Sequence, residues 1–545
     1  MDHIRILNQI ISKDNIVKAF HYAYYDRINN DYYYDYFEME FVYKNKDKII
    51  NEILEEIKDL NSYAQRPAYA YYPPKNELCF RRMIYIPFKD LVLRYAFTIV
   101  LAEYIDPELS NNCFANRKAE KNPSKFSFLQ NFATESWPNF CDWQKKSIET
   151  YSLLLRTDIS SFYDSISHEY LCAIVADSLT IPNDSQVIKL FKKILSVPVI
   201  SYSNLTNKVL SAEELKQGLP IGNNTEGFLA NVYLKNVDDK MRFDNTIFGR
   251  YNDDMRIFSN EKTEIFRAIL VLQELLLAKG LNLNASKTEF AENKEDIEKL
   301  RSKIYDVSEY MGDTELKIES ELKSKVDKSF EDFSSTFEEG DQIDNKSAKD
   351  FCKSLSARNS SNVLLISLGK RAPWHIHRLG EILTKWKGSS KHASWLLIHS
   401  IFFDEIPDET RNKAKEKLFE LLKNPEVCTY GKYRLIHHLV KLRGSNTNYF
   451  RYVDSMSADE KEQLKNISIS FLSKPAFELN IVSLYLLRIL GEVKENLEKL
   501  VNEKALKPIA DPIKNALSYF DGTEIKTENL NLISEYEIDD LPVPY

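Results

Sequence analysis

Two short acidic segments contain the residues best suited to metal-dependent chemistry. Asp253 and Asp254 are flanked on both sides by aromatic and β-branched residues, which predicts strand, tight turn, strand with the carboxylates at the tip. Asp158 follows the apolar run 153–155 after two intervening residues, Arg156 and Thr157, so a buried strand should deliver it at its end. Adjacent like charges repel unless a cation lies between them. Asp238-Asp239 lacks such a setting, and we expect it to be solvated.

Carboxylates delivered by two converging strands could hold two divalent cations. Hard cations prefer carboxylate and backbone oxygens, and a metal pair clamps the attacking and leaving oxygens of an in-line phosphoryl displacement. The alternative is that Asp158 and Asp253 merely end strands at turns. Between them lies a Gly- and Pro-punctuated loop, 217–222, followed by apolar residues at helical spacing up to Met241. Such a loop lets the backbone approach a nucleotide closely.

In this order the three elements resemble motifs A, B and C of the palm of reverse transcriptases. Segment 280–288 is similar to motif D, and segments 82–87 and 113–117 are similar to the fingers. The resemblance covers roughly residues 60 to 290. Two departures stand out: the family usually has Ser-Pro where this chain has Glu226-Gly227, and Arg-Pro-Leu where it has 82–84.

The resemblance implies a metal site and a nucleotide site. The ligands of Mg²⁺ or Mn²⁺ would be Asp158, the Ile159 carbonyl, Asp253 and Asp254. Tyr163 would stack under the sugar and exclude a 2′-hydroxyl, the group that separates ribonucleotides from deoxynucleotides. The enzyme would therefore use dNTPs and release a DNA product.

The remaining implied site residues contact the rest of the nucleotide. Guanidinium groups match phosphate oxygens bidentately, so arginines of the fingers would hold the triphosphate, and a lysine of motif D could protonate the leaving pyrophosphate. These residues are Arg81, Arg82, Gln217, Gly218 and Lys287. For Arg81 and Lys287 the alternative is an exposed, solvated cation.

Composition limits the class of protein. A length of 545 residues predicts two to four domains. The six cysteines have no Cys-x-x-Cys spacing, which favours neither a zinc site nor a disulfide framework and suits a reducing cytoplasm. The N-terminus lacks a signal-peptide pattern and no apolar run reaches membrane-spanning length, so no membrane partner is expected.

The net charge of −8 is unusual for a polymerase, because polynucleotide affinity comes mainly from Lys and Arg. Basic residues interleaved with Trp374 and Trp386 form one local concentration, and such mixtures suit single-stranded nucleic acid. A solvated helical face is the alternative. The basic residues of this candidate nucleic-acid site are Lys370, Arg371, Arg378, Lys385 and Lys387.

The expected fold class is α+β, a right-hand polymerase fingers-palm core followed by an all-α C-terminal domain. Short amphipathic helices separated by turns suggest HEAT-like repeats, with a plain helical bundle as the alternative. The expected domains are a helical leader, fingers and palm, a charged helical connector, a repeat-like helical domain and an acidic tail, at 1–60, 61–290, 291–345, 346–520 and 521–545.

The long helical C-terminal region resembles the unclassified, abortive-infection and defence-associated reverse transcriptases of bacteria. This resemblance implies a DNA polymerase in anti-phage defence, either untemplated and primed by a protein tyrosine or copying a small non-coding RNA. Candidate primers are the Tyr-rich leader, Tyr536 and Tyr545. The alternatives are a conventional RNA-templated reverse transcriptase of a retron or mobile element, and a non-catalytic scaffold. Homo-oligomerisation stays open.

Overall fold

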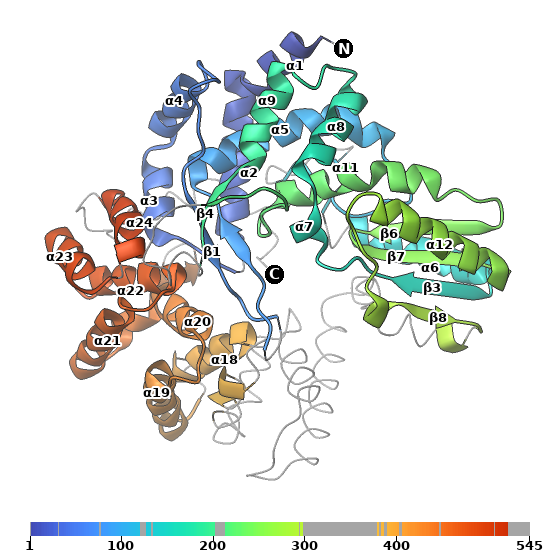
Figure 1. Ribbon diagram of the computed structural model, residues 1–545. Helices are drawn as coiled ribbons and strands as arrows, with labels where there is room; N and C mark the ends of the chain where they lie inside the picture. The colour runs from blue at the N-terminus through green and yellow to red at the C-terminus, as the bar shows by residue number, and fades with distance from the viewer. Residues whose placement is uncertain are drawn as a thin grey trace.

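The computed structural model has an N-terminal α+β part and a C-terminal helical part (Figure 1). It describes residues 2–297 except 31, 76–77, 120–126, 132–134, 202–212 and 294; residues 376, 379–380 and 383–385; and residues 390–520 except 403–405, 446–447 and 506. Within these ranges no helix is long and apolar enough to cross a membrane. Most of the expected connector and the whole expected tail lie outside the described residues.

A four-stranded sheet in the order β6-β7-β3-β8 carries the acidic segments. Its strands are β3 (Leu153–Thr157), β6 (Thr246–Tyr251), β7 (Asp254–Ser259) and β8 (Glu289–Ala291). Both strand predictions are confirmed: β3 pairs antiparallel with β7, and β6 and β7 form a hairpin. Successive side chains of a strand point to opposite faces of the sheet. Leu155 therefore joins the large core, while Leu154 packs with Phe258 on the other face.

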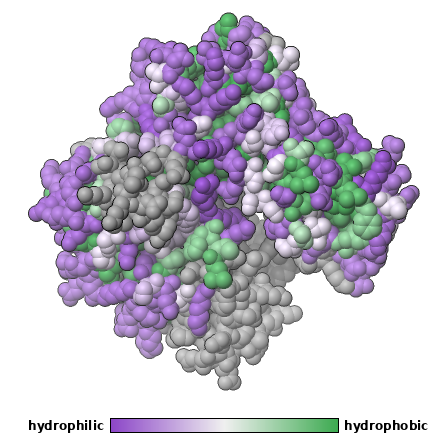
Figure 2. All heavy atoms as spheres, in the orientation of Figure 1, coloured by the Kyte–Doolittle hydropathy of each residue, from purple (hydrophilic) through white to green (hydrophobic). Residues whose placement is uncertain are grey.

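Helices cover this sheet and link it to the rest of the core. The loop after β3 leads into α7 (Phe162–Ser165), and α11 (Asn224–Lys240) precedes the β6–β7 hairpin. The other helices of this region are α6 (Trp137–Thr150), α8 (His168–Leu179), α9 (Gln186–Leu195) and α12 (Lys262–Leu277). On α12 the side chains of Phe266, Leu270 and Leu277 are exposed, and apolar atoms gather over this helix in Figure 2.

A second four-stranded sheet, in the order β2-β1-β4-β5, lies beside the leader. Its strands are β1 (Ala68–Tyr71), β2 (Met83–Tyr85), β4 (Pro198–Ile200) and β5 (Glu213–Glu214). The almost wholly buried helix α5 (Phe88–Ile105) follows β2 and packs against α2. The leader helices are α1 (His3–Ile10), α2 (Lys13–Ile28), α3 (Tyr36–Lys44) and α4 (Lys46–Glu56).

The C-terminal region is a set of short helices that pack on their neighbours. Helix α20 contacts α18 and α22, while α21 contacts α22 and α23 contacts α24. Their bounds are α18 (Ser390–Phe402), α19 (Asp408–Lys423), α20 (Thr429–Val440), α21 (Ala458–Phe471), α22 (Phe477–Ile489), α23 (Lys494–Lys504) and α24 (Lys507–Ser518), with a hairpin of β9 (Arg443–Ser445) and β10 (Asn448–Phe450). A HEAT-like repeat stays a prediction.

The leader tyrosines join the helical region to the second sheet. Tyr36 stacks on Tyr485 of α22 with ring centroids 4.4 Å apart, and Tyr69 of β1 stacks on Phe477 at 4.0 Å. Arg488 adds an ion pair to Glu40 of α3 at 2.7 Å. Because Tyr36, Phe477 and Tyr485 belong to one continuous apolar cluster and Tyr69 packs against it, the C-terminal helices share a core with the leader and β1.

Candidate active site

The hairpin turn between β6 and β7 presents Asp253. Tyr251 pairs with Asp254, which leaves Asn252 and Asp253 as the two residues of the turn. Asn252 has a φ of 56°, the backbone sign that two-residue hairpin turns require. Asn adopts this conformation more readily than most residues. The local sequence therefore fixes Asp253 at the tip of the hairpin, beside the end of β3.

Asp158 lies next to Asp253, as the convergence of the strands predicted. Burial raises the pKa of Asp253, and the nearby charge of Asp158 raises it further. Asp158 itself is only 7% exposed. Two carboxylates held together away from water repel each other, and a divalent cation would relieve that repulsion. The donor set therefore fits Mg²⁺ or Mn²⁺, with Asp158 and Asp253 as its carboxylate ligands.

Asp254 has a different partner. Its two oxygens accept hydrogen bonds from the Arg256 guanidinium at 2.6 and 2.9 Å, and Arg156 lies 3.5 Å away. Burial acts to raise the pKa of Asp254, but the hydrogen bonds and charge of Arg256 outweigh it, so this pKa is below its ordinary value. Among the described residues no group of three His, Cys, Asp or Glu side chains converges as a metal site, and metal binding by Asp254 stays a prediction.

Lys287 contacts the metal-site carboxylate directly. It ends the short helix η3 (Ala285–Lys287), and its Nζ donates to Asp158 Oδ2 at 2.5 Å. The backbone N–H of Asn284 also donates to the Asp158 carbonyl at 2.7 Å, which fixes this loop against the end of β3. Lys287 is thus an ion-paired residue of the site and not an isolated surface cation. Its role as a proton donor to pyrophosphate stays a prediction.

A hollow of about 320 Å³ is lined by Asn252, which precedes Asp253 in the turn, and its volume is at the lower end of the usual size of ligand pockets. Its lining residues are mainly polar: Asp26, Asn29, Asn30, Tyr32, Met83, Asn116, Tyr163, Ile221, Gly222, Asn223, Asn224, Gly227 and Asn252. Burial, followed by the charge of Asp253, holds the pKa of Tyr163 well above its ordinary value, so its ring is neutral. Tyr163 lines the same hollow as Asn252 of the turn, and its role in excluding a 2′-hydroxyl stays a prediction.

The other predicted nucleotide residues lie outside this lining. Gln217 is exposed and forms an isolated antiparallel β-bridge with Ser167. Gly218 has a φ of 87°, and a Cβ there would lie 3.0 Å from the Asp164 carbonyl oxygen. The lack of a side chain at this position therefore lets the two backbone segments lie close together. Arg82 lies 3.5 Å from Asp164, and Arg81 is exposed. Phosphate binding by these arginines stays a prediction.

Several asparagines of the hollow were not anticipated from the sequence. Asn116 donates from Nδ2 to Asn252 Oδ1 at 2.5 Å, and Asn30 donates to the Gly222 carbonyl at 2.9 Å. The buried amide of Asn223 has no hydrogen-bond partner for either polar atom among the described residues. The available signal was the position of Asn223, directly after the glycine-bounded loop.

The expectation for Asp238 was wrong. Asp238 is 3% exposed and accepts hydrogen bonds from Arg250 at 2.7 and 2.8 Å. Arg250 of β6 is fully buried, and a buried guanidinium requires an acidic partner. The fold supplies this partner from α11, a pairing that local composition around Asp238 did not reveal.

Most of the candidate nucleic-acid and priming residues cannot be placed. Lys385 is exposed. The others lie outside the described residues: Lys370, Arg371, Arg378, Lys387, Tyr536 and Tyr545.

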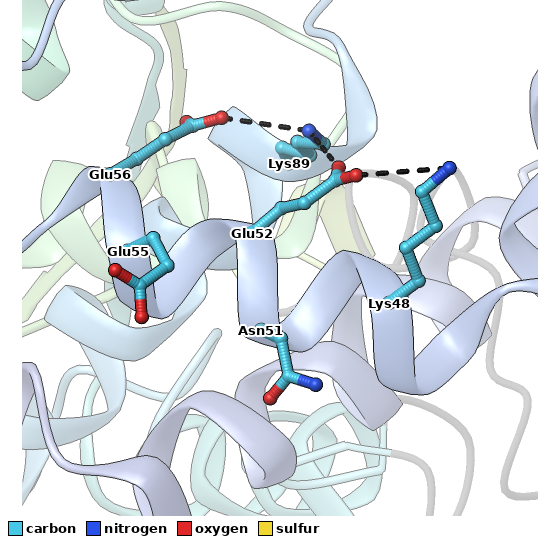
Figure 3. Close-up of a pocket in the computed structure, with 6 residues that line it drawn as sticks. All are labelled: Lys48, Asn51, Glu52, Glu55, Glu56 and Lys89. Carbon is cyan, nitrogen blue, oxygen red and sulfur yellow. Dashed lines mark hydrogen bonds and ion pairs between the residues drawn. The ribbon is translucent and has the colours of Figure 1, made fainter.

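A separate surface hollow lies on α4 and the start of α5 (Figure 3). Glu52 lies between the cations of Lys48 and Lys89, and Lys89 also reaches Glu56 at 3.5 Å. Glu55 and Asn51 complete the lining. Because its charges pair with one another, this hollow shows no arrangement suited to catalysis.

The paired aspartates at the ends of β3 and of the β6–β7 hairpin, next to a hollow lined by Asn252 and Tyr163, form the arrangement expected of a nucleotide polymerase. Residues 39–304 match the family model for reverse transcriptase (RNA-dependent DNA polymerase). The chain therefore carries a reverse-transcriptase domain with fingers and palm, and the protein is a nucleotidyltransferase with DNA polymerase activity. Such domains generally use divalent metals such as Mg²⁺. No curated protein matches the chain.

Proposed function

We propose that this protein polymerises dNTPs through a Mg²⁺ or Mn²⁺ site on Asp158 and Asp253. The observation that carries the proposal is the pairing of these two carboxylates beside the hollow that Tyr163 lines. The bound metals would stabilise the charge that develops on the transferred phosphoryl group. Arg256 keeps Asp254 ionised and fixed at the edge of this site.

Each protein residue has a distinct part in this mechanism. Asp158 and Asp253 would hold the metals, and the neutral ring of Tyr163 would occupy the space that a ribose 2′-hydroxyl needs. Lys287 stands at Asp158, from where its ammonium can give a proton to the departing pyrophosphate. Arg82, which lies 3.5 Å from Asp164, the residue after Tyr163, would hold the triphosphate.

Incorporation of radiolabelled dNTPs tests the catalytic assignment. Asp253→Asn removes one ligand charge while preserving shape, and we expect it to abolish nearly all incorporation. Asp239→Asn is the matched control, because Asp239 is exposed and its ion pair within the described part of the chain is with Arg242, three positions further on. Asp253→Asn activity near that of the wild type would refute the two-aspartate site.

Protein priming of DNA synthesis is the finer part of the proposal. Tyr33 and Tyr36 of the leader are buried in the apolar cluster. Tyr32 instead lines the hollow together with Tyr163. Its backbone is held by Asn30 at 2.9 Å and by the Tyr430 hydroxyl at 3.0 Å. We therefore place Tyr32 first among the described leader tyrosines as a primer.

In the priming step the Tyr32 oxygen attacks the α-phosphorus of a dNTP. A tyrosyl phosphodiester forms, the α–β phosphoanhydride breaks, pyrophosphate leaves and the phenolic proton passes to solvent. A primer tethered to the enzyme has a high effective concentration, which suits a chain of net charge −8. Wild-type protein should carry nuclease-sensitive mass after boiling and phenol extraction. Tyr32→Phe should lose this mass. If the mass persists, Tyr32 is not the primer, and Tyr536 and Tyr545 become the candidates.

We further propose that this synthesis acts in bacterial anti-phage defence, supported by the helical C-terminal region that shares a core with the leader. Phage plating on cells expressing wild type or Asp253→Asn tests this role. Equal plating efficiencies would contradict it. Sequencing the nucleic acid that copurifies with the protein distinguishes untemplated synthesis from copying of a non-coding RNA.

Self-association is a hypothesis for the exposed face of α12. Phe266 and Leu270 lie one turn apart and are 51% and 63% exposed, and exposed apolar patches often mark protein contacts. If this surface joins two copies, Leu270→Glu should lower the mass measured by sedimentation. An unchanged mass would exclude this face as the contact.

A further inference from the structure

We propose that Asn116 is a positioning residue that holds the catalytic turn, and that position 227 is glycine in order to accommodate Asn116. This inference rests on the proposed polymerase function. Asn116 lies in the fingers-like segment 113–117, and Asn252 precedes Asp253 in the turn. Their amides are hydrogen-bonded at 2.5 Å although the residues are 136 positions apart in the chain.

Asn116 is itself held in place by its surroundings. It has a φ of 51°, a left-handed conformation that Asn tolerates and most side chains do not. The carbonyl of the preceding Ala115 accepts a hydrogen bond from Asn231 of α11 at 2.6 Å. The amide of Asn116 therefore projects from a fixed backbone and not from a freely adjustable one.

Gly227 leaves the space that the Asn116 amide fills. A Cβ at position 227 would lie 2.5 Å from Asn116 Nδ2 and 2.7 Å from its Oδ1, distances that real Cβ contacts do not reach. Gly227 lies in the first turn of α11, a buried helix. Any other residue there would displace Asn116 and break its bond to Asn252. The departure from Ser-Pro at positions 226 and 227 thus has a specific structural consequence.

Asn252 is held from a second direction by Arg250. The Arg250 guanidinium donates to the Asn252 carbonyl at 3.2 Å and to Asn231 Oδ1 at 2.8 Å. Arg250 is fixed in turn by its buried ion pair with Asp238. The turn is therefore clamped at its side chain by Asn116 and at its backbone by Arg250.

The need for this clamp follows from the charges at the site. Asp253 and Asp158 repel each other, and that repulsion would move an unsupported turn away from β3. Displacement of reacting groups by about 1 Å can cost on the order of 100-fold in rate. Because Asn116, Gly227 and Asn252 also line the hollow, nucleotide occupancy and carboxylate position are physically coupled.

Enzyme kinetics test the positioning role. We expect Asn116→Ala to lower kcat by about tenfold or more, with a smaller rise in KM for dNTP because Asn116 also lines the hollow. Asn252→Gly keeps a residue suited to positive φ but removes the same hydrogen bond. Adding Asn116→Ala to Asn252→Gly should therefore not lower kcat further. Asn112→Ala is the matched control, because it removes a comparable bond from the same loop to the Phe248 carbonyl, 2.9 Å long and away from the turn. It should keep the wild-type kcat.

A stability cycle tests the role of Gly227 without measuring activity. In the wild type, Gly227→Ala should lower the unfolding midpoint because of the steric conflict. In the Asn116→Ala background the same substitution should raise the midpoint, because Ala is a better helix former than Gly. A change of the same sign in both backgrounds would overturn the steric link. A fall in kcat that is additive for Asn116→Ala and Asn252→Gly, or a rise in KM alone, would overturn the positioning role. Absence of incorporation by the wild type would refute the proposed function instead.

Discussion

The buried ion pair between Glu226 and Arg94 makes stability depend on pH in a direction opposite to that of most carboxylates. Both side chains are essentially inaccessible, and Arg94 Nη1 lies 3.1 Å from Glu226 Oε1. The Thr225 hydroxyl donates to the other carboxylate oxygen at 2.8 Å. However, Glu226 Oε1 and Arg94 Nε have no hydrogen-bond partner among the described residues. Burial therefore outweighs the attraction of Arg94 and raises the pKa of Glu226 to about 7.

The sign and size of the effect follow from this pKa. The ordinary value is 4.5, so between pH 4.5 and 7 the folded state binds more protons at Glu226 than the unfolded state does. The free energy of unfolding therefore falls as pH rises through this window. One pKa unit corresponds to about 1.4 kcal/mol, so the total effect is on the order of 3 kcal/mol.

Glu226→Gln removes the titration while keeping the shape of the protonated side chain. We expect the variant to match the wild type near pH 5 and to become more stable than the wild type by on the order of 3 kcal/mol near pH 8. Thermal unfolding of both proteins at a series of pH values measures this difference, and other titrating groups cancel in the comparison. A difference that does not change with pH would show that Arg94 keeps Glu226 ionised throughout, and would refute the reasoning.

Three further predictions concern the site. Tyr163→Val should raise rNTP relative to dNTP incorporation, whereas Tyr163→Phe should keep the wild-type ratio because the ring remains; equal ratios in all three would remove Tyr163 as the sugar gate. Asn223→Leu removes a buried amide that has no hydrogen-bond partner in the described part of the chain, so it should not lower the unfolding midpoint. The same substitution should raise KM for dNTP, and an unchanged KM would show that this amide does not contact the nucleotide. Lys287→Met removes the cation paired with Asp158, which would compete with Mg²⁺ for this carboxylate. The variant should therefore have a lower kcat and need less Mg²⁺ for half-maximal activity, and a higher Mg²⁺ requirement would contradict this competition.

Local sequence determined the backbone that carries the candidate catalytic aspartates. An apolar run set β3 and placed Asp158 at its end, and the aromatic and β-branched residues around Asn252 and Asp253 set a two-residue hairpin. These features depend on alternation and turn preference, which act over a few residues. The sequence also indicated Tyr163 beside the site, because the motif that contains it starts at the end of β3.

Only the tertiary structure decided which partner each polar group takes. Asp254 pairs with Arg256 and Asp238 with Arg250, although both aspartates belong to similar acidic pairs in the sequence. Asn116 and Asn252 meet across 136 positions. The physical reason is that burial removes water as a partner, so each buried charge or amide must be satisfied by whatever group the packing of distant helices and strands brings within reach. That choice depends on the packed arrangement of α11, β6 and β7, and it leaves no periodic pattern in the chain.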